Sequence, residues 1–503
     1  MSEATLQKYL QAQGFLKFCV CNSKEHQINL VITVQDIPQR HKEVFNVISE
    51  AGTSVGQEVY VVGGYVRDYF LNRIKDSEKL DIDFVTIGSG IELAREVARK
   101  LKTTNLSVFK NFGTARISCE GLDLEFVGAR KENYRRDSRK PIVEDGTMED
   151  DQMRRDFTIN ALSWSLNREN YGELIDPFNG IQDLKRKLIR TPVDPHRTFS
   201  DDPLRMMRAI RFATELQFDI EEQTYKAIEE MNERIEIISK ERIAEELNKI
   251  VMAEKPSIGF TLLFRTKLLH QFFPEMAKLH GVRQVKGVRH KDNFWHTLKV
   301  LDNVAEMSDN LWLRWAAIMH DIAKPATQRF VEGIGWTFHG HDAVGANWVK
   351  SIFRRLGLPL DERMRYVRKL VRLHLRPISL ATEEVTDSAV RRLIYDAGDD
   401  IDDLMILCRA DITSKNDRKV KQYNRNFDRV ERKIKEVEEK DRIRQWKNPI
   451  DGNEIMEALN IKPGPVIGDI KDAIKEAILD GEIPNEHDAA YDYMMKIKDK
   501  YIG

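Results

Sequence analysis

The chain is poor in cysteine and has no long apolar run. Its four cysteines, Cys19, Cys21, Cys119 and Cys408, are scattered over 503 residues. Cys19 and Cys21 are too few for a zinc site without distant ligands, so we expect ordinary reduced thiols. No apolar stretch reaches membrane-spanning length, and residues 1–10 show no signal-peptide pattern. These absences favour a cytoplasmic protein that does not enter a membrane.

An excess of charge of either sign is also missing. The 80 lysines and arginines balance 81 aspartates and glutamates, for a formal net charge of −1. A balanced chain has no overall field that attracts nucleic acid, so such a site must be a local patch. After Asp201, glycine and proline are sparse and apolar residues recur at helical spacing. We expect several domains in an α+β, mostly α protein, with a small α/β head and a long α-helical body.

The most informative segment lies in the predicted head. An apolar strand over Val59–Val62 ends at the Gly63–Gly64 pair, and glycines let the backbone turn and let a phosphate come close. A second strand over 79–85 places Asp81 and Asp83 on one face, because strand side chains alternate. Two carboxylates on one open face repel each other unless cations lie between them. The segment therefore predicts metal-assisted phosphoryl or nucleotidyl transfer.

A third predicted strand, over 122–126, carries two more acids. Alternation places Asp123 and Glu125 opposite its apolar face, where either side chain could add a third carboxylate to the metal site. For Asp123, a solvated acid on an edge strand is an equal alternative, whereas the nearby Arg130 favours a functional Glu125. Two metals held in this way would lower the pKa of an attacking hydroxyl and neutralise a leaving pyrophosphate. The charge-rich segment 131–140 is expected to be a loop.

Two adjacent arginines, Arg154 and Arg155, precede an apolar segment. Their mutual repulsion favours an anionic partner such as a triphosphate, although an arginine pair alone usually marks a solvated surface. Asp156 and Asn160 lie four residues apart, so they share one face if the segment is helical. Together they offer acceptors and donors that suit ribose hydroxyls.

Another helix is predicted to begin at Pro203, with Asp202 near its N-cap. Asp202 and Arg205 are one turn apart, and a carboxylate beside a guanidinium can present a hydrogen-bonding edge to a base. The alternative is a helix salt bridge worth roughly 0.3–0.5 kcal/mol. Arg208 is adjacent to Arg205, whereas Arg211 lies on roughly the opposite side of the helix from Asp202.

These motifs, in this order, resemble the class II tRNA nucleotidyltransferase and bacterial poly(A) polymerase family of the DNA polymerase β-like superfamily. The resemblance covers residues 59–211 and, more loosely, 464–468. It implies a polymerase β-like head in which Asp81 and Asp83 carry Mg²⁺. Beside the resemblance, the strand pattern predicts Glu125 as a third catalytic carboxylate, with Arg130 nearby as a nucleotide-binding residue. The nucleotide-binding residues that the resemblance implies are Gly63, Gly64, Arg67 and Asp68 at the triphosphate, Arg154, Arg155, Asp156 and Asn160 around the nucleotide, Asp202 and Arg205 as a protein template for cytosine or adenine, and Arg208 and Arg211 behind the phosphates.

A second set of chemistry-bearing residues lies in the helical body. His320 and Asp321 are adjacent on an apolar helix, where they are hard to bury without a partner, and a metal is the natural one. Further candidate ligands flank this pair at His296, His341, His374 and Asp411. Their order along the chain resembles the HD metal-phosphohydrolase superfamily. The resemblance implies a divalent Ni, Mn, Fe or Zn ion, with a first metal at His296, His320, Asp321 and Asp411 and a second at His341 and His374. The alternative is an HD fold that keeps its helices without activity.

Together the two resemblances imply a CTP/ATP-dependent tRNA nucleotidyltransferase that adds or repairs the 3′-terminal CCA of tRNA without a nucleic-acid template. Its partners would be tRNA, CTP and ATP, and the sequence predicts no oligomeric state. Three alternatives stay open: a poly(A) polymerase, an enzyme that adds A alone or CC alone, and an HD phosphohydrolase with a nucleotide-sensing head. The expected domains are an N-terminal extension (1–40), the head (41–190), a helical neck with an RNA-binding region (191–285), the HD domain (286–415) and a tRNA-binding helical tail (416–503).

Overall fold

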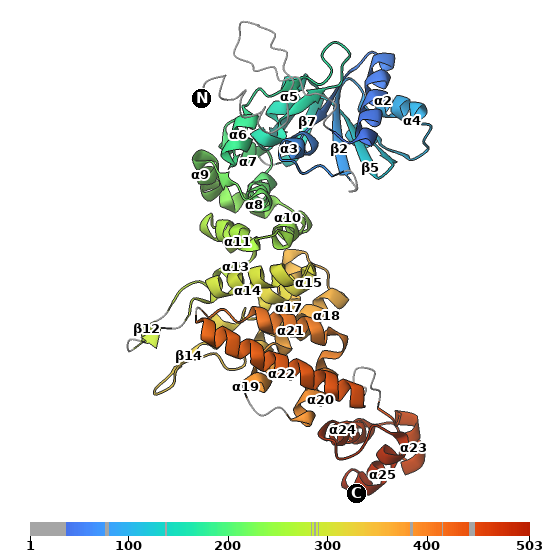
Figure 1. The fold of residues 1–503 in the computed structure, drawn as a ribbon, viewed down its shortest axis with the longest axis vertical. Coiled ribbons are helices and arrows are strands. Elements are labelled where there is room, and N and C mark those ends of the chain that lie inside the picture. The colour runs from blue at the N-terminus through green and yellow to red at the C-terminus, as the bar shows by residue number, and fades with distance from the viewer. Residues whose placement is uncertain are drawn as a thin grey trace. The chain divides into compact units, whose positions relative to one another are not determined.

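The structure is a computed structural model of the 503-residue chain. It describes residues 37–75, 80–135, 138–282, 284–285, 288–289, 291–382, 386–414, 416–441 and 448–502. Cys19, Cys21 and most of the predicted N-terminal extension lie outside these ranges. The chain divides into two compact units, one of residues 1–239 with 265–268 and one of residues 240–264 with 269–503. Figure 1 shows the elements of both units in colours that follow the chain.

The first unit is built on a seven-stranded mixed sheet with the strand order β3-β4-β5-β2-β1-β8-β9. Its strands are β1 (Glu58–Val62), β2 (Leu80–Ile87), β3 (Leu106–Phe109), β4 (Thr114–Cys119), β5 (Leu122–Gly128), β8 (Ser163–Ser165) and β9 (Leu174–Ile175). The strands expected from Val59–Val62, 79–85 and 122–126 are confirmed for their described residues. β2 and β5 run parallel, whereas β1 and β4 pair with them antiparallel.

Helices cover one face of this sheet and leave part of the other open. Helices α2 (Gln39–Val55) and α4 (Gly90–Lys100) pack together, α2 against β1 and α4 against β4 and β5 (Figure 1). The alternating apolar residues of the central strands are fully buried, and the rings of Phe84 and Phe126 stack with centroids 5.1 Å apart. Each such buried side chain stabilises the fold by roughly 1.5–3 kcal/mol. This packing fixes which side chains the sheet presents on its other face.

A charged hairpin follows β5, where a loop was expected. Strands β6 (Arg130–Arg135) and β7 (Ser138–Asp145) pair antiparallel, so the loop prediction for 131–140 was wrong over the described residues. The hydrogen bonds between paired strands are made by backbone groups, so charged side chains do not prevent them. The charge-rich β6 therefore forms a strand by pairing with β7, which contains β-branched residues.

Short helices and turns complete the first unit. They are η2 (Lys110–Phe112), α3 (Gly64–Phe70), α5 (Met148–Met153), η3 (Thr158–Asn160), α6 (Gly180–Arg186), α7 (Pro195–Asp201), α8 (Leu204–Leu216), α9 (Glu222–Met231) and η4 (Asn232–Ile237), with the small parallel pair β10 (Leu188–Ile189) and β11 (Asp219–Ile220).

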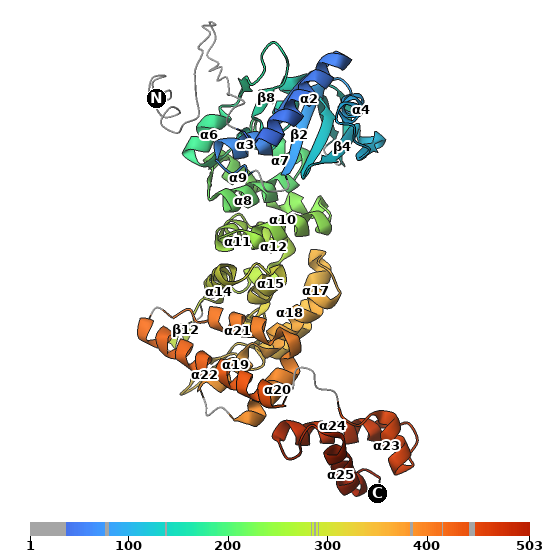
Figure 2. The same cartoon turned by 45° about the vertical axis from the view of Figure 1, so that its right-hand side comes forward.

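The remaining described chain is almost entirely helical, which confirms the mostly α prediction (Figure 2). Its helices are α10 (Lys240–Met252), α11 (Pro256–Arg265), α12 (Leu268–Phe272), α13 (Pro274–Ala277), α14 (Asn293–Met307), α15 (Leu311–Met319), α16 (Lys324–Thr327), α17 (His341–Leu356), α18 (Glu362–Leu373), α19 (Leu375–Thr382), α20 (Asp387–Ala397), η5 (Gly398–Asp400), α21 (Ile401–Ala410), α22 (Asp417–Asp441), α23 (Gly452–Leu459), α24 (Pro465–Asp480), α25 (His487–Ile497) and η7 (Lys498–Lys500). Two small hairpins, β12–β13 (Gln284–Val285, Val288–Arg289) and β14–β15 (Arg329–Val331, Gly335–Thr337), interrupt them.

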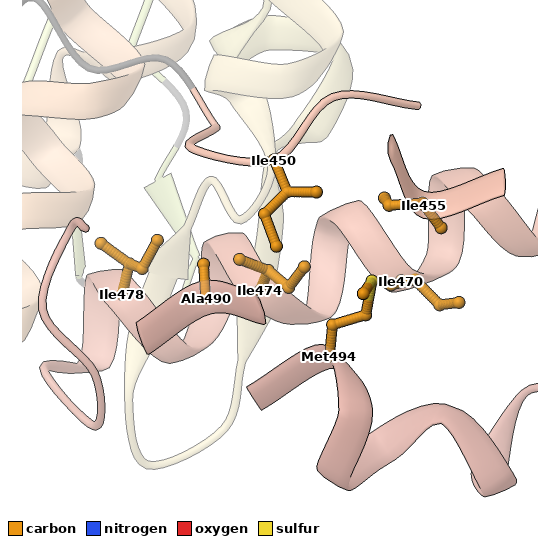
Figure 3. Close-up of a cluster of buried hydrophobic side chains, with 7 residues drawn as sticks. All are labelled: Ile450, Ile455, Ile470, Ile474, Ile478, Ala490 and Met494. Carbon is orange, nitrogen blue, oxygen red and sulfur yellow. The ribbon is translucent and has the colours of Figure 1, made fainter. Parts of the chain in front are cut away.

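The C-terminal helices α23, α24 and α25 share a small apolar core of their own. Ile470, Ile474 and Ile478 recur every four residues along α24, and they pack against Ile450 and Met494 (Figure 3). Pro465 is the first residue of α24, where a proline costs no helix hydrogen bond. In the described part of the chain, no helix combines the length and apolar character that a membrane crossing requires.

Candidate active site and metal centre

Three exposed carboxylates lie on the open face of the first unit's sheet. The parallel register places Asp81 opposite Asp123 and Asp83 opposite Glu125. Asp81, Asp83 and Glu125 are exposed, as alternation predicts, while Ile82 between them is fully buried. Desolvation raises the pKa of Asp83 and of Glu125, and the negative charge of Asp81 raises both further. Acids whose charged forms are disfavoured in this way suit divalent cations, so the donor set fits Mg²⁺.

Asp123 shares that face but has a different environment. It is 3% exposed, its Oδ2 accepts a 2.5 Å hydrogen bond from Arg116 Nη2, and its Oδ1 accepts one from Ser118 Oγ. The alternative of a solvated acid on an edge strand was wrong, because β5 is an interior strand between β4 and β2. Arg116 Nη2 also lies 3.3 Å from Asp81 Oδ1. The sequence reasoning missed Arg116, although alternation along residues 114–119 places it on this face.

The glycine pair forms the turn from β1 into α3. Gly63 has φ 72° and ψ −127°, and a Cβ added there would lie 3.0 Å from Arg155 Nη1. An L side chain at this position is therefore strained and crowded. At Gly64 the nearest atom to an added Cβ is Arg67 Nη2 at 3.8 Å, so the fold has room for a side chain there. The two glycines consequently differ in what the fold requires of them.

A continuous polar network runs from α3 to α8. Arg67 binds both oxygens of Asp68 at 2.9 and 2.8 Å and donates through Nη1 to Asn160 Oδ1 at 2.8 Å. Asn160 Nδ2 donates to Asp156 Oδ1 at 3.0 Å, and Arg208 Nη2 lies 2.6 Å from Asp156 Oδ2. Although burial alone would raise it, the pKa of Asp156 falls to about 2, because Arg208 and Asn160 stabilise its charge. The network brings three motifs of the sequence together.

The segment from Asp156 to Asn160 is not an α-helix, the case in which the two residues were expected to share a face. Asp156 precedes a 3₁₀ turn, and its carboxylate accepts from the backbone N–H of Phe157 at 2.9 Å. Aspartate side chains compete for backbone groups in this way and so favour turns over helix interiors. The two side chains meet nonetheless, which the four-residue spacing had suggested.

The adjacent arginines share a buried counter-ion. Asp151 is fully buried, Arg154 binds its Oδ1, and Arg155 Nη2 lies 3.0 Å from its Oδ2. Burial by itself would raise the pKa of Asp151, but the two guanidinium charges lower it. The sequence reasoning missed Asp151, although it lies three and four residues before the arginines, at helical spacing. It offsets their repulsion and directs Arg155 toward Gly63.

The start of α8 brings the proposed template residues to the same region. Asp202 Oδ1 accepts from the backbone N–H of Leu204 at 3.1 Å, as expected of a residue near the N-cap. Arg205 Nη2 donates to the carbonyl of Arg154 at 2.7 Å. Arg211 is 8% exposed and lies over the Phe212 ring at 4.1 Å, the same ring that the guanidinium groups of Arg67 and Arg208 approach at 5.0 and 5.4 Å. Arg130, at the start of β6, is half-buried.

In the second unit, the six metal-site candidates converge. His296, His320 and Asp411 form one group of potential ligand atoms within 4.8 Å of one another, and Asp321, His341 and His374 form another. Asp321 joins the two groups, with its oxygens 3.2 Å from both His320 Nε2 and His341 Nε2. The residues come from α14, α17 and the ends of α15, α18 and α21.

Three of these histidines are prepared to bind a metal through Nε2. The Nδ1–H groups of His320, His341 and His374 each donate to a backbone carbonyl at 2.7 Å. This leaves a lone pair on each buried Nε2, and among the described residues none hydrogen-bonds these atoms. Burial lowers the pKa of His374 to about 4, which keeps it in the neutral form that metals bind. The residues therefore fit a divalent metal centre.

Two lysines border this centre, and the sequence reasoning missed both. Lys291 Nζ lies 2.9 Å from His296 Nδ1, and Lys324 Nζ lies 2.6 Å from Asp321 Oδ2. Lys324 follows the His320–Asp321 pair by one helical turn, and this spacing is a signal that could have identified it.

Comparisons with known proteins agree with this arrangement. Residues 59–190 match the Poly A polymerase head domain, 217–279 the RNA and SrmB-binding site of polymerase A, 293–416 the HD domain and 379–494 tRNA nucleotidyltransferase domain 2. An A-adding tRNA nucleotidyltransferase of Deinococcus radiodurans is 32% identical over 355 residues, which span 68% of this chain and 78% of that protein. A CC-adding tRNA nucleotidyltransferase of Thermus thermophilus is 29% identical over 448 residues, 86% of this chain and 92% of that protein.

Other matches are partial or structural. The match to an A-adding tRNA nucleotidyltransferase of Aquifex aeolicus is 32% identical and covers 62% of this chain but 36% of that protein. The crystal structure of the Bacillus stearothermophilus CCA-adding enzyme in complex with CTP shares the fold with a TM-score of 0.63, at 22% identity, over 92% of this chain and 99% of that one. With a nucleotidyltransferase head and an HD domain both matched, the chain belongs to the class II tRNA nucleotidyltransferase family.

Proposed function

We propose that this protein adds the terminal CCA to the 3′ end of tRNA, using CTP and ATP and no nucleic-acid template. The observation that carries the proposal is the meeting of three exposed carboxylates, the Gly63 turn and the Arg67–Asn160–Asp156–Arg208 network at one end of the sheet. The proposed partners are tRNA, CTP and ATP, and relatives named as A-adding, CC-adding and multifunctional CCA proteins support this substrate class.

In the proposed reaction, the 3′-hydroxyl of tRNA attacks the α-phosphorus of the nucleotide and pyrophosphate leaves. Asp81, Asp83 and Glu125 would hold Mg²⁺, which when bound lowers the pKa of the hydroxyl and neutralises charge on the pyrophosphate. Arg155 beside the Gly63 turn would bind the phosphates, while Asn160 and Asp156 hydrogen-bond the sugar. The protein contributes chiefly orientation and charge neutralisation.

For base selection we propose Asp202 and Arg205. Both lie at the start of α8, and the hydrogen bond from Arg205 to the Arg154 carbonyl fixes the guanidinium relative to the arginine pair. A fixed donor and a nearby acceptor recognise the edge of cytosine or adenine through hydrogen bonds, in place of a template base. Gly64, Asp68, Arg130, Arg154, Arg208 and Arg211 remain proposed contacts or supports of the nucleotide.

At the HD centre we propose a divalent transition metal such as Ni, Mn, Fe or Zn, held by His296, His320, Asp321 and Asp411, with His341 and His374 serving a second ion. The inward-facing Nε2 atoms support this ligand set. Hydrolysis of a 2′,3′-cyclic phosphate or a 2′-phosphate is the corresponding activity. Purified protein incubated with a cyclic nucleotide and Ni²⁺ or Mn²⁺ tests it, and absence of turnover would count against it.

Extension of a tRNA that lacks its 3′ end tests the main proposal. The tRNA is incubated with CTP alone, ATP alone and both, and products are resolved at single-nucleotide length. CCA addition predicts two additions with CTP alone and a third when ATP is also present. A protein that adds only A to a tRNA already ending in CC would instead match the activity named for the Deinococcus and Aquifex relatives. Long A tracts would identify a poly(A) polymerase.

A further inference from the structure

The open face of the sheet continues beyond the three carboxylates. Arg116 on β4 lies opposite Glu125, and Phe109 on β3 lies opposite Thr114, two residues from Arg116. Directly opposed residues of antiparallel strands share a face, so Arg116 and Phe109 are on the face of Asp83 and Glu125. Both are accessible, with the Arg116 side chain 46% and Phe109 48% exposed. Arg116 therefore borders the metal site, and Phe109 lies on the same face of the sheet one strand further out.

Arg116 is held in place while part of its guanidinium stays available. The buried Asp123 anchors it at 2.5 Å, and Ser118 fixes Asp123 from the other side. Both hydrogen bonds from this guanidinium, to Asp123 and to Asp81, are made by Nη2. Nε and Nη1 make none with the described residues, and a guanidinium presents such donors in the geometry that phosphate oxygens accept.

The strand order separates this pair from the nucleotide residues. Gly63, with Arg155 beside it, follows β1, while Arg116 and Phe109 are on β4 and β3. β2 and β5, which carry the carboxylates, lie between these two sides. In phosphoryl transfer the attacking and leaving oxygens are roughly in line through the phosphorus, so the acceptor enters on the side away from the pyrophosphate.

We propose that Arg116 and Phe109 form the subsite for the 3′ end of the acceptor RNA. Arg116 binds the phosphodiester next to the terminal nucleotide, and Phe109 stacks on one of the unpaired bases at that end. Single-stranded RNA ends are recognised in this way, by a cation on the backbone and an aromatic ring under a base. The inference rests on the proposed nucleotidyl transfer and adds residues that the family resemblance did not imply.

Phe109→Ala tests the stacking contact, with Phe112→Ala as the matched control. Phe112 belongs to the same hairpin turn and is 71% exposed, so its loss removes an equivalent surface ring. We expect Phe109→Ala to raise the KM for tRNA on the order of tenfold, the usual effect of losing one base–aromatic stack. The KM for CTP and kcat should stay within about twofold, and Phe112→Ala should match wild type. Equal effects of the two variants, or none, would overturn the stacking assignment.

The test of Arg116 needs a variant that does not leave the charge of the buried Asp123 beside a neutral side chain. Arg116→Gln alone would do so, and the test therefore uses Arg116→Gln/Asp123→Asn together with the conservative Arg116→Lys. We expect the double variant to raise the KM for tRNA on the order of tenfold and to lower the salt dependence of RNA binding by about 0.7 of a logarithmic slope, one phosphate contact on a single strand. Arg116→Lys should retain the salt slope and part of the affinity.

Two results would contradict the Arg116 assignment. A raised KM for CTP would place Arg116 on the nucleotide side, and a fall in kcat with an unchanged KM for tRNA would mean that it only positions Asp81. Equilibrium binding of labelled tRNA, measured by fluorescence anisotropy without nucleotide, separates this inference from the proposed function. Failure of the wild-type protein to extend tRNA would refute the function, whereas unchanged RNA affinity in both variants would refute the subsite.

Discussion

At the scale of single residues, the site depends on where charged groups find partners. Asp81 and Asp83 follow from strand alternation, because each packs its apolar neighbours into the core and must face outward. Asp123 does not follow, because it becomes a buried counter-ion only when the pairing of β4 with β5 brings Arg116 to it. Asp151 was missed although Arg154 and Arg155 follow it at helical spacing. The outward-facing carboxylates were therefore predictable from local pattern, whereas the burial of Asp123 beside Arg116 was not.

The glycine pair yields a prediction with its own control. Gly63→Ala places a side chain at φ 72° and 3.0 Å from Arg155, so it should destabilise the first unit by roughly 1–2 kcal/mol and weaken CTP binding. Gly64→Ala has room and lies in a helix, so its stability should stay the same or rise. Thermal unfolding and CTP titration measure both variants. A Gly64→Ala protein that is stable but no longer binds CTP would show that the phosphate occupies the space beside Gly64. Equal destabilisation by both variants would contradict the difference described between the two glycines.

Asp156 yields a pH prediction. Its folded-state pKa of about 2 lies below the ordinary value near 3.9, so its charge contributes stability above pH 4 that is lost as the pH falls toward 2. The contribution is about 2–3 kcal/mol at pH 6 and about half of that at pH 3. The difference in unfolding free energy between wild type and Asp156→Asn should therefore shrink on acidification. A difference that stays constant from pH 6 to pH 3 would contradict the network described for Asp156.

At the scale of elements, packing of apolar faces decided which predictions succeeded. The strands of the head and the long helices of the body have strong periodicity, and they formed as expected. The β6–β7 hairpin has mixed charge and no regular alternation of apolar and polar residues. It can therefore be recognised only from the pairing of its two strands. The segment at Asp156 has helical spacing but becomes a turn, because its carboxylate binds the nearest backbone N–H.

The C-terminal core yields a prediction about one element. Ile474 is fully buried between its neighbours on α24 and the facing helices, so Ile474→Ala should cost about 2–5 kcal/mol (Figure 3). Hydrogen exchange should accelerate within residues 448–502 while the first unit keeps its protection. Ile502→Ala, at a position that is 40% exposed, is the matched control and should change little. Faster exchange over the whole chain would mean that this core does not open independently.

At the scale of the whole molecule, one chain carries two sets of side chains that fit metal ions, one in each unit. The carboxylates of the first unit and the histidines of the second differ in ligand chemistry, because oxygen ligands suit Mg²⁺ whereas imidazoles suit transition metals. The motif order predicted both sets. Strand alternation and helical spacing could have identified Arg116 and Lys324, whereas Lys291 became visible only once the fold had placed it beside His296.

Metal titration tests whether the two centres are independent. Mn²⁺ or Ni²⁺ added to metal-free protein should raise the melting temperature of the second unit, because a ligand that binds the folded state stabilises it by mass action. His320→Ala/His374→Ala should abolish that rise while tRNA extension with Mg²⁺ continues. A variant that keeps the full rise would exclude these histidines as ligands.

The most direct test of the central claim is Mg²⁺-dependent extension of tRNA by Asp83→Asn, compared with Glu149→Gln. Both substitutions neutralise one exposed carboxylate of the first unit, but Asp83 belongs to the open face of the sheet and Glu149 does not. We predict that Asp83→Asn loses CTP and ATP incorporation by at least about a thousandfold at unchanged melting temperature, and that Glu149→Gln extends tRNA at the wild-type rate. Undiminished incorporation by Asp83→Asn would contradict the assignment of these carboxylates as the site of nucleotidyl transfer.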